Sequence, residues 1–140
     1  MYIVDEFWII DFNGIPLFNF SPSEDLDSNL VASFFSAIQQ FALEVSKGKG
    51  DRYIDSVKLG KFTFHFLINH EYNLYFISKS SNKVRKKMIR THLHEIERMF
   101  INEYQDLIKN YEGEVSLFEK FKNKFEKYFE DNFTKLKGMW

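Results

Sequence analysis

The sequence predicts an α+β domain with three layers, in which an antiparallel sheet lies between helices. The stretch Tyr53–Ser78 reads as three consecutive strands, because apolar residues alternate along it as the side chains of a strand do. The last of these strands is apolar on both faces, and so is an earlier strand at Phe7–Phe12. Such strands need cover on both sides, so we expect helices above and below the sheet. The predicted order of elements is β-β-α-β-β-β-α-α in a single domain, residues 1–140.

The first two strands are predicted to form a hairpin. Asn13-Gly14 is a strong hairpin signal, since both central positions of a tight turn need a positive φ. The first strand, Phe7–Phe12, is expected inside the sheet because almost all of its residues are apolar. The second strand, Ile15–Phe20, contains Pro16, which cannot donate a backbone hydrogen bond to a neighbour. Proline therefore predicts that the second strand is an edge.

The strand Tyr53–Leu59 is predicted to be the other edge. Asp55, Ser56 and Lys58 interrupt its apolar positions, whereas the two strands that follow are richer in apolar residues. An unpaired edge can extend a sheet across to a partner, so this strand is a candidate contact surface. The candidate residues on it are Tyr53, Asp55, Val57 and Lys58.

A first helix is predicted over Asp27–Ser46, with one charged residue inside it, Glu44. Its predicted inward stripe is Leu30, Phe34, Ile38, Phe41 and Val45, widened by Val31, Phe35 and Ala42. Its predicted outward positions are Ser33, Ser36, Gln39 and Gln40. Most surface helices carry more charge than this one, so its outer face is the second candidate contact surface.

Two further helices complete the predicted domain. One runs over about Lys83–Tyr111, with Asn82 as its cap. Its apolar stripe is Ile89, Leu93, Ile96, Phe100, Tyr104, Leu107, Ile108 and Tyr111. Ser116 and Glu119 have the spacing of a capping box and open the last helix. The apolar residues of that helix are Leu117, Phe118, Phe121, Phe125, Tyr128, Phe129 and Phe133.

The composition indicates in which cellular compartment the protein is expected. The chain contains no cysteine, which excludes a disulfide scaffold and a thiolate zinc site and fits a reducing environment. No apolar run approaches the roughly 20 residues of a membrane span, and the acidic start is unlike a signal peptide. We therefore expect a cytoplasmic protein, either soluble or peripheral to membranes.

The sequence predicts no catalytic, metal or cofactor site. No nucleophile-elbow, zinc-protease or EF-hand spacing occurs. Gly48-Lys49-Gly50 follows a helix without the spacing of a phosphate-binding loop, which indicates an ordinary turn. His92 and His94 lie about 200° apart around a helix, so they cannot ligate one ion from one face. The 17 phenylalanines are expected in the core and not on an exposed sheet face that stacks nucleic-acid bases, because helices are predicted to cover both faces of the sheet.

A basic run stands out from the net charge of −1. Lys83, Lys86, Lys87 and Arg90 are predicted to share a face in the first turns of a helix, where the helix dipole disfavours cations. Either they form a solvated face, or they are kept to bind an anionic surface such as lipid. The whole-chain charge argues against nucleic acid as a partner.

The element order and its two edges resemble the longin domain. The segments that carry the resemblance are WIIDFNGIPLFNF, SFFSAIQQFALEV, IDSVKLGKFTFHF and YNLYFIS, which are similar to small stand-alone longin-type proteins of archaea. The resemblance covers about residues 3–137. It implies a profilin-like, five-stranded antiparallel sheet in the order 2-1-5-4-3, with one helix on one face and two on the other.

The resemblance also implies a class of function. Longin domains occur in SNAREs, small adaptor-complex subunits, tethering subunits and exchange factors for Ras-like GTPases, and they act by binding proteins. The first hypothesis is therefore a non-enzymatic module that pairs with a longin or roadblock domain, in a homodimer or a heterodimer, and serves a small Ras-like GTPase or a membrane-traffic complex. The second is a peripheral membrane adaptor that uses the basic run. The third is a small-ligand sensor.

Overall fold

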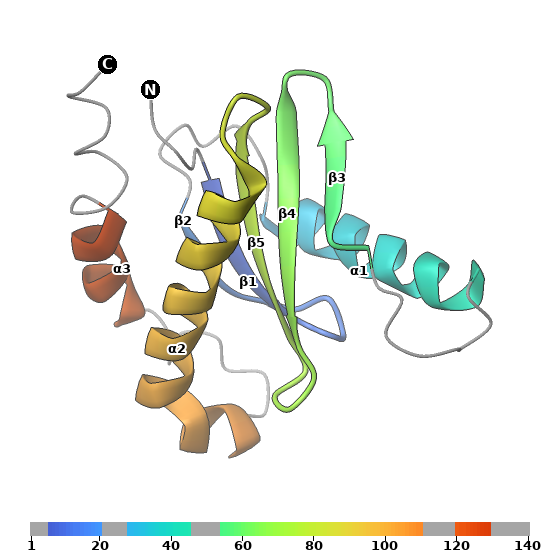
Figure 1. Ribbon diagram of the computed structural model, residues 1–140. Helices are drawn as coiled ribbons and strands as arrows, with labels where there is room; N and C mark the ends of the chain where they lie inside the picture. Colours follow the sequence, from blue (N-terminus) through green and yellow to red (C-terminus); the bar gives the residue numbers. More distant parts are fainter. Residues whose placement is uncertain (1–5, 21–27, 46–53, 111–119, 130–140) are drawn as a thin grey trace.

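The structure, a computed structural model, describes residues 6–20, 28–45, 54–110 and 120–129. These residues form a five-stranded antiparallel sheet in the order β2-β1-β5-β4-β3, with helices on both faces (Figure 1). The predicted fold class, sheet order and both sheet edges are confirmed. The elements are β1 (Glu6–Asp11), β2 (Pro16–Phe20), α1 (Ser28–Val45), β3 (Ser56–Leu59), β4 (Phe62–Asn69), β5 (Leu74–Ser81), α2 (Lys86–Asn110) and α3 (Phe121–Phe129).

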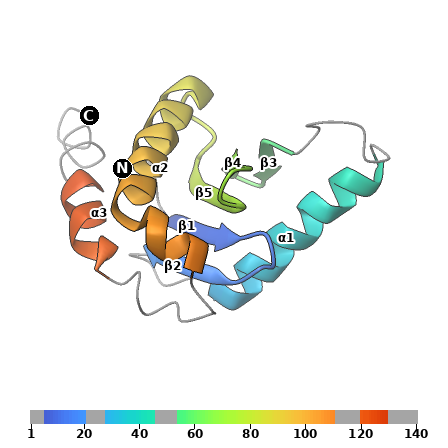
Figure 2. The ribbon, with the colours of Figure 1, turned by 90° about the horizontal axis from the view of Figure 1, so that it is seen from below.

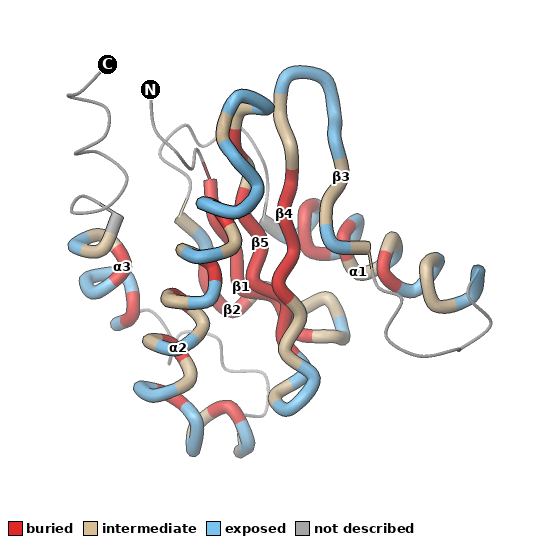
Figure 3. The backbone as a smooth tube through the Cα atoms, in the orientation of Figure 1, coloured by how far each residue is buried: buried red, intermediate tan, exposed pale blue. Residues whose placement is uncertain are grey.

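The sheet separates two hydrophobic cores. Helix α1 covers one face, while α2 and α3 cover the other (Figure 2). Successive residues of β1 point to opposite faces, so Trp8 and Ile10 enter the α1 core while Phe7 and Ile9 enter the other. All six residues of β1 are buried, as Figure 3 shows. The apolar character of β1 on both faces therefore reflects its inner position in the sheet.

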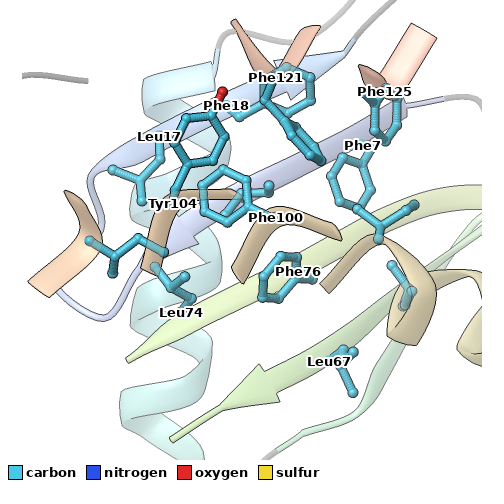
Figure 4. Close-up of a cluster of buried hydrophobic side chains, with 14 of the residues drawn as sticks. Phe7, Leu17, Phe18, Leu67, Leu74, Phe76, Phe100, Tyr104, Phe121 and Phe125 are labelled. Atoms are coloured by element: carbon cyan, nitrogen blue, oxygen red, sulfur yellow. The ribbon is translucent and has the colours of Figure 1, made fainter. Parts of the chain in front are cut away.

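Aromatic rings fill the core under α2 and α3 (Figure 4). Phe125 stacks on Phe7 with ring centroids 4.7 Å apart, and Phe121 meets Phe18 edge-on at 5.2 Å. From the other helix, Phe100 contacts both Phe76 and Phe121. The buried residues of α2 are those of its predicted stripe: Ile89, Leu93, Ile96, Phe100, Tyr104 and Ile108.

The β1–β2 hairpin has a longer turn than predicted. Of the two turn residues, only Gly14 has a positive φ, at 86°. Asp11 accepts backbone hydrogen bonds from Asn13 and Ile15 on its carboxylate, at 2.9 and 2.8 Å. The pairing of β1 with β2 then shifts by one residue beside Ile9, as a β-bulge does. A carboxylate that binds two backbone N–H groups stabilises this wider loop, so the prediction of two positive φ angles is wrong.

Helix α2 begins later than the sequence predicts. Val84 donates its backbone N–H to the carbonyl of Ser81 at 3.1 Å, and Lys83 donates to the Ser81 hydroxyl at 3.2 Å. These bonds hold Lys83 in a turn before Lys86, the first helical residue. Asn82 does not cap the helix, since its side-chain amide donates to the carbonyl of Gly60 in the β3–β4 loop.

Several predictions lie outside the described residues. They concern the turn Gly48–Gly50, the residue Tyr53, the capping box Ser116–Glu119, and Tyr111 and Phe133 as stripe residues. Within the described residues, no helix combines the length and the apolar character that crossing a membrane requires.

Candidate interaction surface

Helix α1 is rotated relative to the prediction. Leu30, Phe34, Phe41 and Val45, predicted to face the sheet, have exposed fractions of 68%, 47%, 68% and 66%. We call these four residues the α1 stripe. The buried face of α1 consists instead of Val31, Ala32, Phe35 and Gln39. The prediction that the α1 stripe packs inward is therefore wrong.

Phe35 shows why this face of α1 is the buried one. Its ring packs against two residues of β4, with centroids 5.1 Å from Phe64 and 4.9 Å from Phe66. It also meets the edge of the Trp8 ring at 6.2 Å. Burying a phenylalanine among three aromatic rings stabilises the fold by both area and ring geometry. Turning α1 to bury Phe34 instead would break these contacts.

Gln39 lies on the buried face, although it was predicted to point outward. Its side-chain amide donates to the carbonyl of Ile54 at 2.8 Å, and the N–H of Ile54 donates back to the side-chain oxygen at 3.1 Å. The glutamine side chain is fully buried. Its amide binds both the N–H and the carbonyl of Ile54, as the backbone of a neighbouring strand would. Gln39 therefore fixes α1 to the segment that leads into β3 and is not a surface residue.

The other three predicted positions on α1 differ in exposure. Ser33 and Gln40 are exposed, as predicted. Ser36 is half-buried, and its hydroxyl donates to the carbonyl of Phe12 at 3.4 Å. Ser36 therefore faces the β1–β2 loop rather than open solvent.

Strand β3 is the edge of the sheet beside α1. It pairs with β4, and in the described part of the chain with no other strand. Val57 is half-buried and packs against the α1 core, whereas Lys58 and Leu59 are exposed. Figures 1 and 2 both show the C-terminal half of α1 extending past β3. Gln39 of α1 is hydrogen-bonded to Ile54, just before β3, so α1 and β3 are neighbours, and we call the α1 stripe and the β3 edge together the α1–β3 surface.

This surface holds most of the exposed apolar side chains of the described residues. Among the described residues six large apolar side chains are exposed, and four of them form the α1 stripe; the other two are Leu59 at the end of β3 and Met88 on α2. Contiguous exposed apolar residues on a globular protein mark an interaction site more often than scattered ones. The sequence contained a signal for this site, namely a second apolar stripe on α1 beside the one that is buried.

The basic run does not form the single face that was predicted. Lys86 forms an ion pair with Asp55 at 2.9 Å, and Arg90 donates to the carbonyl of Phe66 at 3.4 Å. The hydrogen bond from Lys86 holds the pKa of the Asp55 carboxyl below its ordinary value. Lys87 is exposed, and Lys83 precedes the helix. Two of the four cations therefore bind within the protein instead of presenting one cationic face.

Two histidines are partly or fully buried against the sheet and helices. Burial lowers the pKa of His65, and the nearby cations Lys86 and Arg90 lower it further. His92 lies 2.7 Å from the hydroxyl of Tyr128, and burial lowers the pKa of His92 and raises that of Tyr128 to about 12. Among the described residues, no group of three or more histidine or carboxylate side chains is placed to hold a metal ion.

The fold is similar to two solved structures. MglB from Myxococcus xanthus matches with a TM-score of 0.62 and 11% sequence identity, over 74% of this chain and 85% of MglB. The chain has a longin-like fold. The mammalian SRP receptor matches with a TM-score of 0.61 and 16% identity, over 94% of this chain and 96% of the receptor chain. At these identities the likeness concerns the fold alone. No protein-family model and no curated protein sequence matches the chain.

Proposed function

We propose that this chain is a non-enzymatic interaction module that binds a longin or roadblock domain through the α1–β3 surface. In doing so it scaffolds or regulates a small Ras-like GTPase or a membrane-traffic complex. The observation that carries the proposal is that four of the six exposed large apolar side chains of the described residues lie together on α1. The resemblance to longin domains supplies the class of partner.

The chemistry of the surface favours a protein as the partner. Burying the two exposed phenylalanines of the α1 stripe removes apolar area from water, which favours association by about 25 cal/mol for each Å². The β3 edge offers backbone hydrogen bonds to a strand from the partner. A surface that combines apolar side chains with a strand edge suits a folded domain with a matching edge.

A binding assay with purified proteins tests the proposal. The immobilised chain is offered the Ras-like GTPases of the same cell, each loaded with GDP or a GTP analogue, and the longin and roadblock proteins of that cell. We expect Phe41→Asp to weaken capture at least tenfold, because it places a charge in the apolar contact. Gln40→Asp is the matched control, since Gln40 is exposed on the neighbouring turn position outside the α1 stripe. Equal capture by native chain and Phe41→Asp, or capture of none of these proteins, would overturn the proposal.

A further inference from the structure

We propose that one end of the sheet binds the surface of an anionic lipid bilayer. This end consists of the β3–β4 connection, the β5–α2 connection and the first turn of α2. It carries five exposed cations, which we call the basic end: Lys58, Lys61, Lys83, Arg85 and Lys87. The inference goes beyond the proposed function, because it assigns a second ligand to a part of the surface that does not include the α1 stripe.

The sheet brings these cations together from two segments of the chain. Phe62 pairs with Leu59 of β3 on one side and with Ser81 of β5 on the other. Strands β3 and β5 therefore end in the row where β4 begins. The backbone N–H of Asn82 donates to the carbonyl of Lys61 at 3.1 Å, which ties the two connections to each other. Both lie at the top of Figure 1, and Figure 3 shows them as exposed.

The basic end lacks acidic partners. None of its five cations forms an ion pair within the described part of the chain, whereas the neighbouring Lys79 and Lys86 each bind a carboxylate. Residues 56–90 contain a single acid, Glu71, which follows the other end of β4. Cations that repel one another without a compensating acid destabilise a fold, and an anionic ligand relieves that repulsion.

Two apolar side chains accompany the cations. Four of the six exposed large apolar side chains form the α1 stripe, and the remaining two are Leu59 and Met88. Leu59 follows Lys58 at the end of β3, and Met88 follows Lys87 in the first turn of α2. Peripheral proteins bind anionic lipid through cations beside apolar side chains that enter the headgroup region. A cationic surface that serves only solubility has no need of the apolar pair.

The rest of the chain has the opposite charge. The sequence has 19 basic and 20 acidic residues, so without the five cations 14 basic residues remain against 20 acidic ones, a net charge of −6. An anionic bilayer therefore attracts the basic end and repels the remainder, which orients the molecule. Nucleic acid suits this surface less well, because single strands bind by stacking on aromatic rings, and neither Leu59 nor Met88 provides one.

Sedimentation with vesicles tests the charge requirement. The native chain should sediment with vesicles of mixed phosphatidylcholine and phosphatidylserine, less so at high salt, and not with pure phosphatidylcholine. The triple variant Lys61→Glu, Lys83→Glu, Arg85→Glu should bind the mixed vesicles more weakly by about tenfold or more, because it reverses three of the five charges. Glutamate shortly before α2 suits the helix dipole, so we expect the variant to fold, which circular dichroism checks.

A matched control makes the same change in net charge elsewhere. The triple variant Lys120→Glu, Lys122→Glu, Lys127→Glu reverses exposed lysines at α3 and should bind the mixed vesicles as the native chain does. Equal weakening by both triple variants would show that only the net charge of the chain matters, and would overturn the inference.

A fluorescent probe tests the orientation without changing any cation, since the chain has no cysteine of its own. An environment-sensitive dye on Leu59→Cys should shift its emission to shorter wavelength when mixed vesicles are added. Glu71→Cys is an exposed position beyond the other end of β4, about 23 Å away along the strand, and its dye should not shift. A dye on Phe41→Cys reports on the α1 stripe and should not shift either.

The outcomes separate this inference from the proposed function. Absence of sedimentation with the mixed vesicles, or a dye shift at Phe41→Cys in place of Leu59→Cys, would overturn the inference. Tighter binding of an RNA oligonucleotide than of the vesicles would assign the basic end to nucleic acid and also overturn it. Phe41→Asp should bind vesicles as the native chain does. Native vesicle binding by a chain that captures no GTPase, longin or roadblock protein would support the inference and count against the proposed function.

Discussion

Single residues decide how the layers of this protein are joined. Gln39 is the clearest case, because its amide binds both backbone groups of Ile54 and is fully shielded from water. Pairing such a group matters, since leaving a buried polar group without a hydrogen bond costs about 1–3 kcal/mol. The pattern of the sequence could not predict this role, because a glutamine in a helix is normally solvent-exposed. The partner of Gln39 is 15 residues away and becomes apparent only in three dimensions.

Replacing Gln39 tests this account. Gln39→Leu keeps the volume of the side chain nearly constant but leaves the N–H and carbonyl of Ile54 without their partner. We expect the free energy of unfolding to fall by about 1–3 kcal/mol. Urea denaturation measures the loss, and Gln40→Ala, at the exposed neighbouring position, should change stability by less than about 0.5 kcal/mol. Native stability in Gln39→Leu would show that the two bonds contribute nothing net.

For helices and strands, the sequence predicts where each element lies and of which type it is better than it predicts which face of the element is buried. The strands β4 and β5 form where their patterns predict strands, and the buried residues of α2 all belong to its predicted stripe. Helix α1 has two apolar stripes side by side, and hydrophobicity alone could not choose between them. Contacts of Phe35 with Phe64 and Phe66, far along the chain, make the choice. For this reason two of the four outward positions predicted on α1, Ser33 and Gln40, are exposed, whereas Ser36 is half-buried and Gln39 is buried.

Two neighbouring phenylalanines test the orientation of α1. Phe35→Ala removes a ring that is 2% exposed, so we expect a loss of about 3–5 kcal/mol in the free energy of unfolding. Phe34→Ala removes a ring that is 47% exposed and should cost less than about 1 kcal/mol. Both are measured by urea denaturation at one low protein concentration, so that association adds little. Similar losses for the two variants would contradict the rotation of α1 described above.

For the whole molecule, the arrangement of the sheet follows from its two edges and two covered inner strands. Pro16 and the polar residues around Asp55 predict the edges from local chemistry alone. The neighbours of β1 are harder to predict, because Ile9 pairs with Phe76, 67 residues away, and no local pattern records that pairing. Only the resemblance to longin domains predicts the strand order 2-1-5-4-3.

The stability of the whole fold should depend on pH through its buried histidines. Burial lowers the pKa of both His65 and His92 below the ordinary value of 6.5. Below about pH 6.5 the unfolded chain therefore binds more protons than the folded one, and stability falls as the pH decreases. The slope is at most about 1.4 kcal/mol per pH unit for each histidine.

Denaturation curves between pH 7.5 and 5 measure this dependence, with all pH values chosen above the ordinary range of carboxyl titration at about 4. The double variant His65→Asn, His92→Gln should flatten the curve over this range. His94→Gln, at an exposed position of α2, should leave its slope unchanged. A native curve that is already flat between pH 6.5 and 5 would contradict the prediction.

The pairing of β1 with β5 also constrains how the chain can fold as it is synthesised. Strand β1 is apolar on both faces, yet its inner neighbour in the sheet ends at Ser81. Until the ribosome has released that residue, the β1–β2 hairpin exposes one whole edge of β1, and such edges pair readily with other chains. Closing the sheet then depends on a contact between distant residues, which slows folding. The stage before Ser81 emerges is therefore the one at which the nascent chain is most exposed to aggregation and most in need of a chaperone.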